Sequence, residues 1–246
     1  NEEKLRRALF FLVALAAGAL FGDAFLHLLP EAFEQMGFGV GVPMCVLAGF
    51  GTFFLLEKTL HWRNQKGTPH TQIAPIGRMN ILADGMHNFV DGLLIGAAFL
   101  VSPTLGFATT LAVILHEIPQ EIGDFGVLLH AGYSRTQALW VNFGTALTAV
   151  LGAVVALSIG ARAEAFVVWL VPFAAGGFIY IAACNLVPEI QKETKPAKSA
   201  LQFAAMSLGV AAMFGILWME GHEHGHGHDH HHAHEKTEKV LPVAAR

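Results

Sequence analysis

Long apolar segments follow one another along almost the whole chain and are separated by short polar connections. Each segment has about 20 residues or more, which is the length of α-helix needed to cross the hydrocarbon core of a bilayer. The pattern predicts an all-α fold, a polytopic membrane helical bundle with seven visible spans. The predicted spans are residues 5–29, 39–60, 75–101, 105–130, 136–160, 165–188 and 199–220. We expect residues 1–220 to form one bundle and residues 221–246 to form a separate tail.

The composition agrees with a chain that lies in lipid. Hydrophobic residues make up 54% of the chain and charged residues only 14%, whereas soluble domains carry about 25% charged residues. The net charge is −4 and nothing in the chain resembles a nucleic-acid surface. No GxxxxGK[ST] loop is present, so we do not expect ATP hydrolysis. The two cysteines, Cys45 and Cys184, fall within predicted spans and form no zinc-ribbon or disulfide pattern.

Two neighbouring spans carry polar stripes. On the fourth span the stripe covers an arc of about 140° at 100° per residue, and it consists of His116, Glu117, Gln120, Glu121 and Asp124. On the third span the stripe covers about 100°, and it consists of Asp84, His87, Asn88 and Asp91, joined by Asn80. Each carboxylate costs about 2.5–3.5 kcal/mol at the bilayer centre. The two stripes are therefore predicted to face each other and enclose an ion site.

The residue types in the stripes indicate a divalent metal. Histidine and carboxylate ligands suit zinc, iron, manganese and cadmium, and no cysteine offers a soft thiolate ligand there. Pro119 lies among the ligand residues, where its ring frees the carbonyl of Leu115 from the helix ladder. Broken helices at mid-membrane commonly form ion sites in transporters, so we expect an irregular turn at Pro119.

The charges outside the spans predict the orientation of the chain. Of the 15 Lys and Arg residues, eleven fall on one side of the seven-span arrangement and four on the other. By the positive-inside rule, the visible N-terminus is cytoplasmic and the C-terminal tail is extracytoplasmic. We expect an integral protein of the cell (inner) membrane.

The tail is rich in histidine. Eight of the thirteen residues from His222 to His234 are His, mixed with Gly, Asp and Glu. Such a segment cannot pack a core, so we expect it to be disordered and to concentrate metal near the outer face.

The two stripes resemble the signature of the ZIP family of zinc and iron permeases, in its LIV-1-like branch. The family has HNxxD in one span and HExPHExGD in the next; here these read HNFVD, His87–Asp91, and HEIPQEIGD, His116–Asp124. LFGDAFLHLLPEA, Leu20–Ala32, and FAAGGFIYIA, Phe173–Ala182, are similar to its flanking spans. The resemblance implies eight spans, the first of which is not in this chain, and metal uptake into the cytoplasm through a binuclear centre.

The resemblance also implies which residues hold metal. One site would use His87, Asp91, His116 and Gln120, and the neighbouring site would use Asn88, Glu117 and Glu121. The chain departs from the family at two places. Gln120 stands where the branch usually has His, and residues 142–149 lack the Glu that some members use for the second site.

Other interpretations remain open from the sequence. An intramembrane zinc protease shares the start of HExxH, with a general-base Glu and a distant DG ligand motif. Gln120 and Pro119 depart from that pattern. A cation-diffusion exporter also uses HxxxD pairs but has six spans and a cytoplasmic metal domain. Gly18 and Gly22 form a GxxxG motif, which fits either internal packing or a homodimer.

Overall fold

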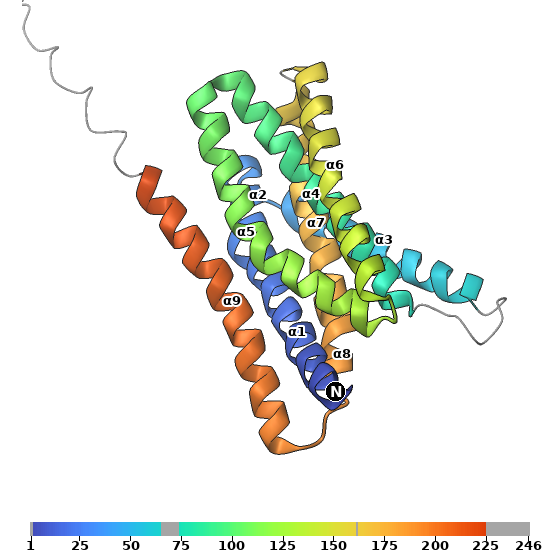
Figure 1. The fold of residues 1–246 in the computed structure, drawn as a ribbon. Coiled ribbons are helices and arrows are strands. Elements are labelled where there is room, and N and C mark those ends of the chain that lie inside the picture. Colours follow the sequence, from blue (N-terminus) through green and yellow to red (C-terminus); the bar gives the residue numbers. More distant parts are fainter. Residues whose placement is uncertain (1, 65–73, 161, 225–246) are drawn as a thin grey trace, which may run out of the picture.

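Helices make up every regular element in the part of the chain that the structure, a computed structural model, describes: residues 2–64, 74–160 and 162–224 (Figure 1). In chain order these are α1 Glu2–Asp23, η1 Ala24–Leu28, α2 Leu29–Met36, α3 Gly41–Asn64, α4 Pro75–Val101, α5 Pro103–His130, α6 Arg135–Ile159, α7 Arg162–Tyr180, η2 Ile181–Leu186, α8 Val187–Ile190 and α9 Pro196–His224. The two η segments are π-helical turns. The predicted all-α membrane bundle is confirmed.

The helices follow the predicted spans closely. α4 begins and ends where the third span was predicted, and η1 and α2 extend the first span to Met36. Within the described residues, five stretches are long and apolar enough to cross a membrane, and α4 and α5 are not among them. These two helices are long enough, at 27 and 28 residues, but they carry the polar stripes. The protein is an integral membrane protein whose two most polar spans lie beside each other.

Small residues bring the helices together in close pairs. α4 packs along α6, α1 along α9 and α3 along α7, while α5 lies between α4 and α1 (Figure 1). In the α4–α6 pair, a Cβ added to Gly92 would lie 1.9 Å from the carbonyl oxygen of Ala149, and one added to Gly152 would lie 2.1 Å from that of Phe89. Backbones approach this closely in membranes only where side chains are small.

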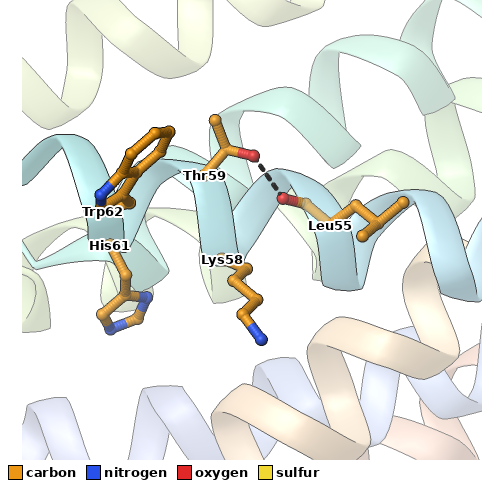
Figure 2. Close-up of a pocket in the computed structure, with 5 residues that line it drawn as sticks. All are labelled: Leu55, Lys58, Thr59, His61 and Trp62. Carbon is orange, nitrogen blue, oxygen red and sulfur yellow. Dashed lines mark hydrogen bonds between the residues drawn. The ribbon is translucent and has the colours of Figure 1, made fainter.

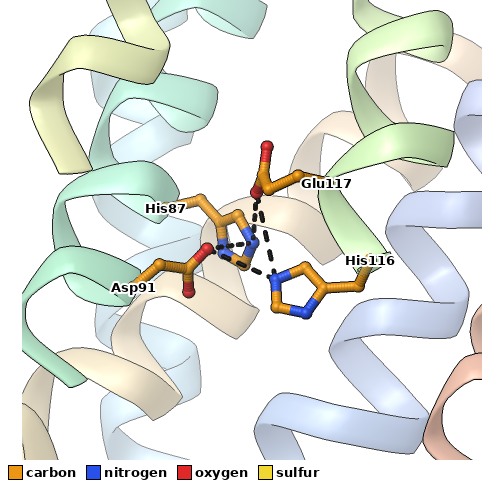
Figure 3. A group of neighbouring side chains, drawn as sticks. All are labelled: His87, Asp91, His116 and Glu117. Atoms are coloured by element: carbon orange, nitrogen blue, oxygen red, sulfur yellow. Dashed lines mark hydrogen bonds and ion pairs between the residues drawn. The ribbon is translucent and has the colours of Figure 1, made fainter. Parts of the chain in front are cut away.

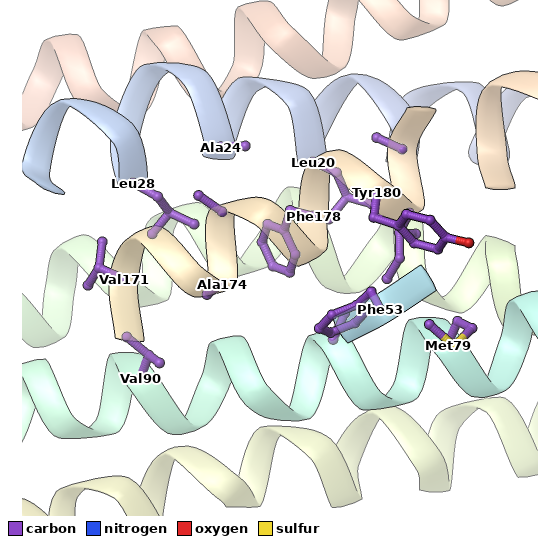
Figure 4. Packing of buried hydrophobic residues seen from close by; sticks show 14 of the residues in the cluster. Leu20, Ala24, Leu28, Phe53, Met79, Val90, Val171, Ala174, Phe178 and Tyr180 are labelled. Atoms are coloured by element: carbon purple, nitrogen blue, oxygen red, sulfur yellow. The ribbon is translucent and has the colours of Figure 1, made fainter. Parts of the chain in front are cut away.

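The apolar core lies around α7, between α1 and α4 (Figure 4). Phe178 of α7 is 1% exposed and belongs to one buried cluster with Leu28, Met79 and Val90. This cluster holds α1, α4 and α7 in fixed positions around the polar stripe of α4.

The irregular turns do not lie where the sequence predicted. α5 continues through Pro119 as one helix, whereas η1 and η2 widen the helical path shortly before Pro30 and Pro188. A proline ring clashes with the carbonyl four residues earlier, and in both cases that carbonyl lies within the π-helical turn. A wider turn relieves the clash without ending the span.

The histidine-rich tail falls mostly outside the described residues. α9 continues to His224, so the first histidines of the predicted tail are helical. The prediction for residues 225–246 lies outside the part that the structure describes.

Gly152 offers a test of the close α4–α6 contact. Gly152→Ala places a methyl group against the carbonyl of Phe89, and we expect it to lower the free energy of unfolding by about 1–3 kcal/mol, as overpacking does. Gly144 lies on the same helix with nothing within 4 Å of an added Cβ, so Gly144→Ala should not destabilise. Thermal unfolding in detergent compares the two variants, and equal stability would contradict the contact.

Candidate metal centre

A short connection forces the two polar helices to run antiparallel. α4 ends at Val101 and α5 begins at Pro103. Ser102 between them caps α5, because its hydroxyl oxygen accepts a hydrogen bond of 3.2 Å from the backbone N–H of Leu105. Proline at the first position of α5 supports the same helix start. The stripes on α4 and α5 consequently face each other along the middle of the bundle.

Four side chains converge between these helices (Figure 3). His87 Nε2 lies 3.3 Å from Asp91 Oδ2 and 3.4 Å from Glu117 Oε1. His116 Nε2 lies 3.3 Å from the same oxygen of Asp91. One ligand atom from each of the four residues lies within 4.8 Å of the others, and the side chains of His87, Asp91 and His116 are at most 1% exposed.

This outer cluster, His87, Asp91, His116 and Glu117, has the composition of a zinc site. Two imidazole nitrogens and two carboxylate oxygens can complete a tetrahedron around Zn²⁺. Among the residues that the structure describes, neither ring nitrogen of His87 and neither carboxylate oxygen of Glu117 has a hydrogen-bond partner, and all four atoms are buried. Leaving such groups unpaired costs about 1–3 kcal/mol each, and a divalent cation would satisfy them.

A second cluster adjoins the first and contains only carboxylates. Asp84, Glu117 and Glu121 bring one oxygen each to within 4.8 Å of the others, so Glu117 belongs to both clusters. The amide of Asn88 donates a 2.8 Å hydrogen bond to Asp84 Oδ1. One turn further along both helices, Asn80 donates a 3.0 Å hydrogen bond to Asp124, and both residues are buried. We call the line of polar side chains between α4 and α5 the seam. Along it, the possible ligands change from nitrogen and oxygen in the outer cluster to oxygen alone in the second cluster.

A third polar ladder approaches the outer cluster from α1. His27 Nδ1 lies 3.1 Å from Asp23 Oδ1, and its Nε2 lies 3.7 Å from Glu31 Oε2. The other oxygen of Asp23 lies 3.9 Å from His87 Nδ1, and Asp23 is fully buried. This geometry suits a carboxylate that orients a ligating histidine from behind.

The predicted site residues fall into three groups. His87, Asp91, His116 and Glu117 come together directly, and Glu121 joins the second cluster. Asn88 turns its amide toward Asp84. Gln120 is 4% exposed, and its amide nitrogen has no hydrogen-bond partner among the described residues.

Asp84 is the residue that the expected ligand sets did not contain. The sequence places it on the polar stripe of α4, but the resemblance does not assign it to either site. In the structure it supplies a carboxylate beside Glu117 and Glu121. On α6, where some relatives have a Glu, Thr148 instead donates a 2.7 Å hydrogen bond to the carbonyl of Gly85. The second cluster therefore draws its three carboxylates from α4 and α5 alone.

A surface pocket of about 620 Å³ lies elsewhere, on α3 (Figure 2). Its walls are Leu55, Lys58, Thr59, His61 and Trp62. All five belong to one helix and none belongs to a cluster of metal ligands. This pocket does not contribute to the metal centre.

The fold and the site together define a polytopic membrane protein with a cluster of possible metal ligands buried between two spans. The model of the ZIP zinc transporter family matches residues 2–74 and 63–217. The chain belongs to the ZIP zinc transporter family. Members of this family are transporters, so the protein is not an enzyme, and the protease and cation-diffusion interpretations are set aside.

Known relatives agree with this assignment. The chain is 38% identical to zinc transporter ZIP13 of Pongo abelii, over 82% of this chain and 65% of that protein. It is 35% identical to zinc transporter ZIP13 of Danio rerio, over 86% of this chain and 75% of that protein. It is 30% identical to zinc transporter SLC39A7 of Mus musculus, over 89% of this chain and 65% of that protein. The chain thus spans 65–75% of the length of these relatives.

Gln120 provides a test of the ligand set. Imidazole binds zinc more strongly than an amide oxygen does, so Gln120→His should tighten metal binding, by about tenfold if it adds one ligand. A binding titration with zinc and cadmium on purified protein measures the change. Unchanged affinity and unchanged selectivity would place Gln120 outside the ligand set.

Asp84 provides a test of the second cluster. Asp84→Asn removes one of three carboxylates, so we expect the weaker of two bound metals to be lost, with an affinity change of about 10–100-fold, while the tighter one is kept. Calorimetric titration with zinc measures the affinity and the number of bound ions. Glu34→Gln, a change at an exposed carboxylate of α2, is the control variant. Full stoichiometry at unchanged affinity in Asp84→Asn would contradict the assignment.

Proposed function

We propose that this chain carries a divalent metal, with zinc as the first candidate, across the membrane into the cytoplasm. The observation that carries the proposal is the outer cluster of two histidines and two carboxylates, buried between α4 and α5. A fixed cation would be very costly at that depth, and these side chains offer the ligands that offset the cost. The zinc transporters among its relatives support the same function. Iron, manganese and cadmium share this ligand preference and remain candidate substrates.

The order of ligands along the seam supports a direction of travel. His27 and Glu31 of the α1 ladder lie toward the extracytoplasmic side in the proposed orientation, and the oxygen-only Asn80–Asp124 pair lies toward the cytoplasm. Borderline ions such as zinc hold imidazole more firmly than carboxylate alone. A metal that leaves the outer cluster for the second cluster thus meets weaker ligands, which favours release into the cytoplasm.

Alternating access around this seam is the mechanism that we propose. The chain has no GxxxxGK[ST] loop, so the energy would come from the metal's own gradient, the membrane potential or proton exchange. The visible N-terminus would be cytoplasmic and the tail extracytoplasmic, in the cell (inner) membrane. A homodimer, the remaining expected partner apart from metal and lipid, is a further proposal.

Histidine substitutions test the route directly. His87→Ala and His116→Ala each remove a buried ligand, and we expect each to reduce zinc uptake into sealed vesicles by about 10–100-fold or more. Gln120→Ala should reduce uptake less. Vesicles must contain equal amounts of inserted protein. Full activity in either histidine variant would remove that residue from the route.

The tail gives a second, independent test. Deletion of residues 222–234 should weaken uptake when metal is scarce and leave the maximal rate nearly intact, because a histidine-rich segment can concentrate metal without lining the route. Uptake measured across a range of zinc concentrations separates the two effects. Complete loss of transport at saturating zinc in an inserted protein would contradict this role.

A further inference from the structure

A histidine and a carboxylate from different helices meet at the end of the bundle away from the outer cluster. His130 is the last residue of α5, and Glu189 lies in α8. His130 Nε2 lies 3.0 Å from Glu189 Oε1, and the two side chains are 22% and 24% exposed. They are therefore partly covered by protein and partly open to the surroundings.

His130 lies beyond the C-terminal end of the polar stripe of α5, near the edge that His116 forms. It follows His116 by fourteen residues, which places it about 21 Å further along the helix and about 40° around it. Asp124 lies about 80° around the helix from His116 in the opposite sense, so His130 continues the edge of the stripe that His116 forms. His130 is therefore the first possible metal ligand on α5 after Asp124.

The sequence around Glu189 repeats the sequence around Glu31. Residues 27–31 read HLLPE and residues 185–189 read NLVPE. Each stretch overlaps or directly follows a π-helical turn, η1 or η2. Glu31 ends the ladder from α1 beside His27, and Glu189 has the same place in the second copy. Glu31 and Glu189 thus each follow a π-helical turn and a proline, and they lie at opposite ends of the bundle in the proposed orientation.

We propose that His130 and Glu189 form an inner gate that a divalent cation opens. The proposal rests on the proposed transport function. In the closed state the direct contact of His130 with Glu189 links the C-terminal end of α5 to α8. α5 also carries His116 and Glu117 of the outer cluster. Both groups are ligands that zinc accepts, so an outgoing cation replaces their contact by binding to them and then leaves.

The neighbours of the pair fit this role. Lys192 Nζ pairs with the other oxygen of Glu189, Oε2, and so leaves Oε1 to His130. The ring of Phe10 in α1 lies 6.4 Å from the ring of His130, between centroids, and packs beside the imidazole. Once a cation has left, the ammonium of Lys192 offsets the charge of Glu189 and holds it where it can contact His130 again.

Cross-linking tests whether the pair must separate. In a chain with Cys45→Ala and Cys184→Ala, His130→Cys and Glu189→Cys can be joined by a bifunctional thiol reagent whose linker a reductant cleaves. We expect cross-linking to stop zinc uptake into vesicles and reduction to restore the rate measured before it. Single-cysteine variants treated alike should keep their uptake, and mass spectrometry verifies the link. Normal uptake by cross-linked protein, or failure of the two positions to link, would overturn the gate.

A second variant tests the part that the side chains play. His130→Ala should lower the maximal rate of zinc uptake several-fold while zinc binding at the outer cluster, measured by titration, stays unchanged. Lys198→Gln breaks the 2.9 Å pair with Glu193 in the connection after α8, away from the ligand face, and is the matched control. A rate in His130→Ala equal to that of this control would overturn the gate. No uptake by the unmodified chain would refute the transport function instead.

Discussion

The contact between the polar stripes of α4 and α5 is the constraint on which the rest of the structure depends. Three carboxylates on α5 would each cost about 2.5–3.5 kcal/mol in hydrocarbon, more than its apolar residues return at about 0.3–0.6 kcal/mol each. Neither α4 nor α5 is apolar enough to qualify as a span by itself. Each helix is tolerated because the other presents hydrogen-bonding groups and metal ligands to it. The remaining helices have to enclose this seam and keep lipid away from it.

Glycine and alanine make that enclosure possible. On α5, Gly123 faces Ala16 and Gly126 faces Leu12, and an added Cβ would lie 2.8 Å and 2.4 Å from their Cβ atoms. α1 can therefore lie directly against α5. This close approach brings Asp23 within 3.9 Å of His87, so the packing of small residues determines which charged groups can reach the metal centre.

The sequence predicted the helices well because their cause is local. A run of about 20 apolar residues is enough to predict a span, and helical periodicity placed Asn80, Asp84 and Asp124 on the correct faces. The sequence did not predict that Asp84 shares a cluster with Glu121. This contact depends on how far α4 is shifted along the antiparallel α5, which periodicity within one helix does not determine. Proline also gave an incomplete signal. Pro30, Pro119 and Pro188 each remove one hydrogen bond from an apolar helix, so the local signal is the same for all three, but only Pro30 and Pro188 follow π-helical turns.

A transport site has to give up its ion as readily as it binds it, and the order of side chains between α4 and α5 bears on both requirements of the proposed function. The outer cluster combines imidazole with carboxylate, and the second cluster has carboxylate alone. Glu117 belongs to both clusters, so in the proposed route a cation would exchange ligands one at a time and would keep at least one protein oxygen. Loss of nitrogen ligands lowers affinity for zinc at each step. Two adjoining clusters of different ligand strength would thus spare the proposed route both a site that binds zinc too tightly for release and a bare ion in hydrocarbon.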